Sequence, residues 1–156
     1  MYRILILFLA LILFPASHPP GERSPYFSPI DLVLDTRQNR LMVVGETACE
    51  IRAYDLNDFS SYSSRNTELP PKSICLAGDK ILVACSHAEG SLLVFNTHTL
   101  EPLGSVKVGP GACDVEVRQD LSLAYVANQF SDDISVVDLI QMRELERIRV
   151  LRQPKQ

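Results

Sequence analysis

Tryptophan is absent from this 156-residue sequence, which has only five tyrosines and six phenylalanines. An aromatic platform that stacks sugars or nucleic-acid bases is therefore not expected. The sequence has no basic block either. Its 15 Lys and Arg residues are outnumbered by 19 Asp and Glu residues, which gives a formal net charge of −4. The concentrated positive charge of a nucleic-acid-binding protein is missing, so we expect no nucleic-acid partner.

Several motifs that carry chemistry are missing as well. The sequence contains no C-x-x-C, so it has neither a thioredoxin-type dithiol nor a haem-attachment site. It has no nucleophile elbow, phosphate loop, H-E-x-x-H or calcium loop. We therefore predict no catalytic residue, no metal and no cofactor in this chain. The four cysteines, Cys49, Cys75, Cys85 and Cys113, allow three complete disulfide pairings, and three of them lie in or beside apolar strands. Small buried hydrophobic side chains are the favoured interpretation.

No apolar run is long enough to span a membrane as a helix, which needs about 20 residues. The longest, Ile4 to Phe14, follows Arg3 and precedes a stretch rich in Pro and Ser. This pattern is typical of a secretory signal. We predict a signal peptide over residues 1–18, a linker over residues 19–29, and export to the periplasm, the cell surface or the medium. An uncleaved anchor is the alternative.

The rest of the chain contains three copies of a repeat, each with three predicted strands. The third copy is the clearest, with strands predicted over Cys113–Val117, Ser122–Asn128 and Ile134–Asp138. The second copy reads KSICLA, KILVAC and SLLVFNT, and the first reads IDLVLD, LMVVG and EIRAYDL. The three copies occupy residues 30–70, 71–110 and 111–153.

The spacing of the copies predicts the fold class. Gly45, Cys85 and Asn128 end the second strand of each copy, at intervals of 40 and 43 residues. A period of about 40 residues that contains only strand patterns is typical of β-propeller blades. We therefore predict an all-β fold of three four-stranded antiparallel blades. LGSVKV and ELERIRV supply the fourth strand of the second and third copies, whereas the polar FSSYSSRNTEL of the first copy is a poor strand.

The third copy also resembles a known family. The segment AYVANQFSDDISVVDL is similar to the YVTN-type β-propeller repeat of bacterial surface and periplasmic proteins. The resemblance covers residues 30–156 and weakens toward the N-terminus, where VVGE and VACS stand in place of VAN. It implies a propeller scaffold whose ligand is often unknown.

Three blades are fewer than the four to eight with which propellers typically close. An open arc leaves one apolar face of its first blade and one of its last blade uncovered. We therefore expect the chain to be the N-terminal part of a longer propeller, with a ring of several copies as the alternative. Self-association through the open faces is expected in isolation.

Candidate ligand-binding residues come from loops that a propeller gathers on one rim. They are His87, Glu89, Asp114, Asn128, Asp132 and Asp133. Structural roles compete with this interpretation, because the Asp132-Asp133 pair is a common turn composition and rim side chains are usually solvated. Asp55, Asn96 and Asp138 precede turns, where an Asx side chain bonds to the backbone two residues on.

The sequence thus predicts an exported, non-catalytic propeller that binds an unknown protein or small molecule. Two alternatives belong to other classes. Similar propellers are sometimes followed by c-type cytochrome domains, which would make this the propeller portion of a redox protein. A lactonase-like hydrolase is the third hypothesis, and it needs a metal held on the propeller axis by several blades.

Overall fold

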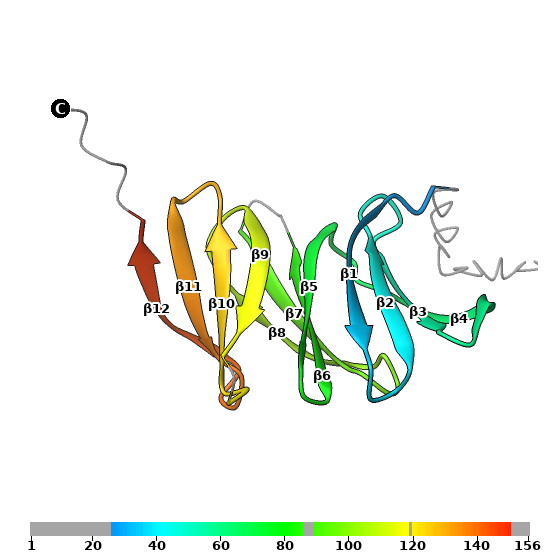
Figure 1. Cartoon of the computed structure of the whole chain (residues 1–156). Coiled ribbons are helices and arrows are strands. Elements are labelled where there is room, and N and C mark those ends of the chain that lie inside the picture. The colour runs from blue at the N-terminus through cyan, green and yellow to red at the C-terminus, as the bar shows by residue number, and fades with distance from the viewer. Residues whose placement is uncertain (1–25, 86–88, 119, 151–156) are drawn as a thin grey trace, which may run out of the picture.

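The protein folds into three β-sheets that stand side by side in an open arc (Figure 1). The computed structural model describes residues 26–85, 89–118 and 120–150. Within these ranges there is no helix long and apolar enough to cross a membrane. The predicted signal peptide lies outside the described residues.

Each sheet is a four-stranded antiparallel meander, and so the all-β blade prediction is confirmed. Blade 1 consists of β1 (Pro29–Asp35), β2 (Arg40–Gly45), β3 (Glu50–Asp55) and β4 (Asp58–Asn66). Blade 2 consists of β5 (Pro71–Ala77), β6 (Lys80–Cys85), β7 (Ser91–Asn96) and β8 (Pro102–Lys107). Blade 3 consists of β9 (Ala112–Val117), β10 (Leu123–Asn128), β11 (Asp133–Asp138) and β12 (Arg143–Arg149).

One element differs from the sequence prediction. The polar segment of the first copy forms β4, which at nine residues is the longest strand described in the chain. It pairs with β3 from Glu50↔Asn66 to Asp55↔Asp58, and eight of its nine residues are exposed. An outermost strand needs little apolar character, because backbone hydrogen bonds hold it to the adjacent strand and do not depend on apolar side chains.

The turns after the third strands confirm the Asx prediction. Asp55 Oδ1 accepts a hydrogen bond from Asn57 N at 2.7 Å. Asn96 Oδ1 accepts one from His98 N, and Asp138 Oδ1 accepts one from Ile140 N, each at 2.8 Å. These three side chains therefore hold equivalent hairpins in the three blades.

The hydrophobic core lies between the blades. Met42, Val44 and Ile51 of blade 1 pack against Ile81 and Val83 of blade 2. A second cluster joins blade 2 to blade 3, through Leu82, Ala84 and Leu92 on one side and Ala124, Val126 and Val137 on the other. Blade 2 is covered on both faces, so that β6 is buried over five consecutive residues.

The two end blades are each covered on one face only. In β1, Val33 packs on the first core cluster, while Leu32 and Leu34, on the opposite face, are 60% and 49% exposed. In β10, burial alternates along the strand, because Ala124 and Val126 face blade 2 and Tyr125 does not. Within the described residues the arc is open.

Candidate functional site

The innermost strands of the three blades, β1, β5 and β9, lie next to one another and share a polar ladder. Asp31 Oδ2 accepts hydrogen bonds from Ile74 N at 2.9 Å and from Ser73 Oγ at 3.0 Å. Ser73 Oγ also lies 2.9 Å from Asp114 Oδ1. Since the hydroxyl has one proton, it donates to one carboxylate at a time. The ladder connects all three blades across both interfaces.

The ladder repeats with the blades. Asp31 and Ser73 are 42 residues apart, and Ser73 and Asp114 are 41 apart. Asp31 Oδ1 accepts Leu32 N at 2.8 Å, and Asp114 Oδ1 accepts Val115 N at 2.9 Å, so the two carboxylates are oriented alike. Ser73 is 5% exposed, whereas Asp114 is exposed. The blade-3 end of the ladder is therefore open to a further hydrogen-bond donor.

An ion pair lies next to the ladder. Lys72 Nζ, in β5, pairs with the carboxylate of Glu46, in the turn between β2 and β3. Both side chains are partly exposed. Together with Ser73, Lys72 ties the inner strand of blade 2 to blade 1.

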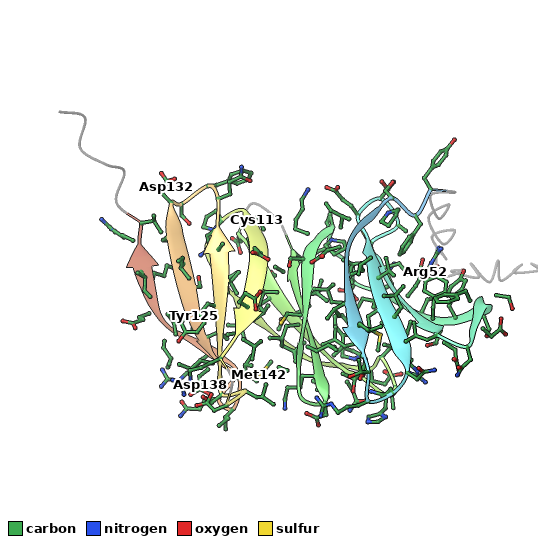
Figure 2. All side chains as sticks on the ribbon, viewed as in Figure 1. Arg52, Cys113, Tyr125, Asp132, Asp138 and Met142 are labelled. Atoms are coloured by element: carbon green, nitrogen blue, oxygen red, sulfur yellow. The ribbon has the colours of Figure 1, made fainter. Side chains whose placement is uncertain are left out.

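Three of the predicted site residues lie together at the rim of blade 3. Asn128, Asp132 and Asp133 line an open hollow of about 580 Å³ that Cys113 also borders. Figure 2 shows Asp132 and Cys113 at one end of blade 3, with Asp138 and Met142 at the other end. Asp132 has a left-handed backbone conformation, with φ of 53°.

Asn128 is held within this rim by structural hydrogen bonds. It is 2% exposed, and its Nδ2 donates to Asp133 Oδ1 at 2.7 Å and to Ser135 Oγ at 2.8 Å. Ser135 Oγ in turn accepts Gly109 N, which belongs to the connection from blade 2. Asn128 and Ser135 thus join the β10–β11 hairpin to the segment that enters blade 3.

Of the other predicted residues, Asp114 belongs to the ladder and Glu89 lies in blade 2. Glu89 pairs with Lys107 at 2.8 Å, so its carboxylate is directed to the outermost strand of blade 2. His87 lies outside the described residues. Among the described residues, no group of three or more His, Cys, Asp or Glu side chains could hold a metal ion. Ligand binding by the six predicted residues stays a prediction.

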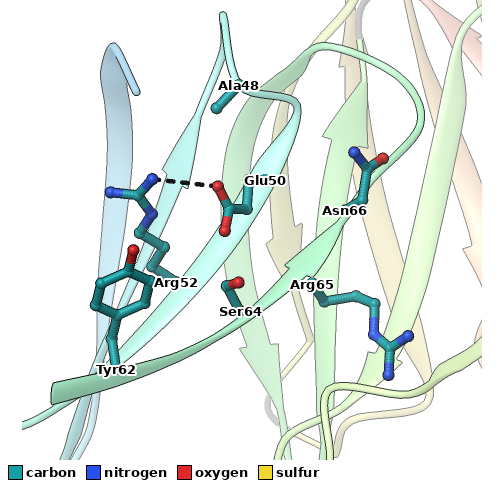
Figure 3. Close-up of a pocket in the computed structure, with 7 residues that line it drawn as sticks. All are labelled: Ala48, Glu50, Arg52, Tyr62, Ser64, Arg65 and Asn66. Atoms are coloured by element: carbon teal, nitrogen blue, oxygen red, sulfur yellow. Dashed lines mark hydrogen bonds and ion pairs between the residues drawn. The ribbon is translucent and has the colours of Figure 1, made fainter. Parts of the chain in front are cut away.

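A second hollow, of about 450 Å³, lies over β3 and β4 of blade 1 (Figure 3). Arg52 lies in it, with its guanidinium 3.9 Å from the centre of the Phe27 ring and 4.8 Å from that of Tyr62. Arg52 Nη2 donates to Glu50 Oε2 at 3.2 Å. Burial alone would lower the pKa of Arg52, but hydrogen bonds with Tyr54 and Glu50 outweigh burial and raise it. The guanidinium therefore stays charged between two aromatic rings.

Sequence reasoning did not identify Asp31, Ser73 or Arg52. The first two could have been found by aligning the inner strands, since IDLVLD, KSICLA and CDVEVR place Asp31, Ser73 and Asp114 in register. Arg52 carries no such signal, because the equivalent position is Leu93 in blade 2 and Ser135 in blade 3.

Comparison with known proteins supports the fold. No protein-family model and no curated protein sequence matches the chain. The structure is similar to that of hydrazine synthase from Kuenenia stuttgartiensis, a β-propeller-containing protein, with a TM-score of 0.75 at 16% sequence identity. The match covers 85% of this chain and 39% of the hydrazine synthase chain, so this chain corresponds to less than half of that protein's length.

Proposed function

We propose that this protein is an exported, non-catalytic β-propeller scaffold that binds a partner through its rim and needs further blades to complete its ring. The observation that carries the proposal is the ladder of Asp31, Ser73 and Asp114. In the described structure, Asp31 and Ser73 bridge blades 1 and 2, and Ser73 and Asp114 bridge blades 2 and 3. Exposed Asp114 repeats the orientation of Asp31 and so can accept the same donors from a fourth inner strand.

The apolar faces of the end blades support the same proposal. Leu32 and Leu34 of blade 1 occupy positions equivalent to Ile74 and Leu76 of blade 2, which pack in the first interface. On blade 3, Tyr125 and Ala127 are equivalent to Leu82 and Ala84, which are fully buried in the second interface. Side chains of the type that pack between blades thus face outward at both ends of the arc.

The scaffold role rests on how the rim uses its polar groups. Asn128 and Asp133 bond to each other, and Glu89 pairs with Lys107. These bonds hold the rim hairpins in shape, which is what a preformed binding surface requires.

Light scattering tests the ring. We expect the isolated chain to self-associate or to bind a hydrophobic dye, and a version extended by further blades to be monomeric and to melt cooperatively. Substituting Leu32 and Leu34 with Ser should reduce the association of the isolated chain. A wild-type chain that is monomeric, binds no dye and melts cooperatively would contradict the proposal.

A further inference from the structure

We propose that the outer edge of β4 is a docking site for an extended peptide strand of a partner protein. The strand would add to blade 1 as a fifth strand. This inference goes beyond the proposed function, because it uses the outer edge of a blade and neither the rim nor the open blade faces.

The first argument is that β4 is an unprotected edge. It is the last strand in the order β1-β2-β3-β4, and only Asp58 and Arg65 among its nine residues are charged. Edge strands usually carry charges, Pro or bulges that prevent pairing with another strand. The other two outer strands have such features. β8 begins at Pro102, and β12 reads RELERIR. β4 has a register shift only near its start, opposite Tyr54 and Asp55, and is regularly paired from Tyr62 to Asn66.

The second argument is that β4 directs alternate backbone groups to solvent. Thr67 N donates to Cys49 O at 2.7 Å, one pair beyond Glu50↔Asn66. In an antiparallel ladder, hydrogen-bonded residue pairs alternate with pairs that are not hydrogen-bonded. Counting from the Cys49–Thr67 bond, Ile51↔Arg65 and Ala53↔Ser63 are hydrogen-bonded pairs. The N–H and C=O groups of Tyr62 and Ser64 therefore point away from β3. An incoming strand about 4.8 Å from β4 would bond to them.

The third argument is that β4 has a hollow on each of its faces. Tyr62 and Ser64 line the hollow of about 450 Å³ that contains Arg52. Arg65 and Thr67 line a second hollow of about 400 Å³, between blades 1 and 2. Successive residues of a strand point to opposite faces. A strand beside β4 would therefore direct its side chains into the two hollows in turn, which is how strand addition acquires specificity.

The lining of each hollow indicates the side chain that it fits. Leu93, Phe95 and Pro102 make one wall of the interblade hollow, which suits an apolar side chain. In the other hollow Arg52 is already paired with Glu50, and Arg65 pairs with Glu101 of blade 2. Tyr62, Ser64 and Asn66 complete a polar lining, which suits a polar side chain. The expected ligand is an extended peptide in which polar and apolar residues alternate.

Peptide selection followed by an edge variant tests the proposal. A displayed library of random 12-residue peptides is selected on the full chain, and the enriched peptides are synthesised with a fluorophore for anisotropy titration. Ser64→Pro removes an outward N–H but no bond to β3, so the sheet should keep its stability. Ser64→Ala is the matched control, because it keeps the N–H.

We expect enriched peptides with alternating polar and apolar residues. Their binding should weaken at least about tenfold with Ser64→Pro and less than about twofold with Ser64→Ala. If Ser64→Pro does not fold, amide hydrogen exchange of the wild-type chain tests the proposal instead. A bound peptide should protect the Tyr62 and Ser64 amides from exchange. Peptides that bind Ser64→Pro as tightly as the wild type, or leave both amides unprotected, would overturn the proposal.

A second copy of the chain is the competing occupant. If no peptide is enriched, and light scattering shows a wild-type dimer that Ser64→Pro dissociates, the edge pairs with another copy and the proposed partner class is wrong. Association through the open blade faces is distinguishable, because Ser64→Pro leaves those faces unchanged.

Discussion

Asp31 and Ile74 are joined across the first interface between blades by a hydrogen bond of 2.9 Å, from the backbone N–H of Ile74 to Asp31 Oδ2. The donor lies in the inner strand of one blade and the acceptor in the inner strand of the preceding blade. The same oxygen lies 3.0 Å from Ser73 Oγ, so one carboxylate organises the junction at the axis.

Removing this carboxylate should destabilise the protein. Asp31→Ala leaves the N–H of Ile74 without its acceptor, which should lower the free energy of unfolding by about 1–3 kcal/mol. Chemical denaturation measures the change. Asp79→Ala is the control, because Asp79 is an exposed turn residue whose side chain pairs with the adjacent Lys80. Equal destabilisation by the two substitutions would show that the axial bond has no special role.

A charge in the second core cluster should unfold the protein. Val126 is 0% exposed and packs between blades 2 and 3. Val126→Asp places a carboxylate there without a partner and should cost about 3–5 kcal/mol, much of the stability of a typical domain. Thermal melting should show a large loss of Tm, whereas Val150→Asp, at a 55% exposed position, should change it little. An unchanged Tm for Val126→Asp would contradict the packing of blade 3 on blade 2.

The aromatic stack around Arg52 should contribute to the stability of blade 1. Arg52→Ala removes the guanidinium between Phe27 and Tyr62 and the ion pair with Glu50. We expect a loss of about 1–2 kcal/mol in denaturant unfolding. Arg52→Met keeps the aliphatic stem and should recover part of the loss, since the stem also packs. If Met and Ala were equally destabilising, the charge alone would account for the effect.

Burial should make Cys85 unreactive in the folded protein. Burial, together with the nearby Cys49, raises the pKa of this thiol from 9.0 to about 12. Because the thiolate is the reactive form, iodoacetamide at pH 8 should label half-buried Cys113 first and Cys85 only after unfolding. Peptide mass spectrometry over time gives the order, and early labelling of Cys85 would show that the interface between blades 1 and 2 opens readily.

The same pKa shift makes stability depend on pH. The folded state keeps the Cys85 proton to a higher pH than the unfolded state does. The contribution of this thiol is therefore complete below pH 9 and is lost as the pH rises from 9 toward 12. Cys85→Ala should lessen the loss of stability over this alkaline range.

The N-terminal segment should direct export. Arg3 precedes eleven apolar residues, Ile4 to Phe14, and a Pro- and Ser-rich stretch follows. N-terminal sequencing of protein from the source cell should begin near His18. Recovery of soluble cytoplasmic protein that still begins at Met1 would contradict export.

The blade strands could be predicted from the sequence because their patterns are local and repeated. KILVAC and LAYVAN carry enough strand-forming residues to be recognised without the structure, and their spacing predicts the blades. The polar β4 strand could not be predicted in this way. It forms because its backbone pairs with β3, and a backbone hydrogen bond does not require an apolar side chain.

The sequence by itself determined the number of repeats, the boundaries of most strands and the Asx turns, since all of these depend on residues close together in the chain. Only the tertiary structure decided which polar side chains meet. Asp31, Ser73 and Asp114 come together because the blades stack with their inner strands adjacent, and Arg52 meets Phe27 because the chain before β1 lies against blade 1. Within single blades, strand pairing brings Glu89 to Lys107 and Asn128 to Ser135. Contacts between residues some 40 positions apart depend on how the sheets pack, and no local pattern specifies that packing.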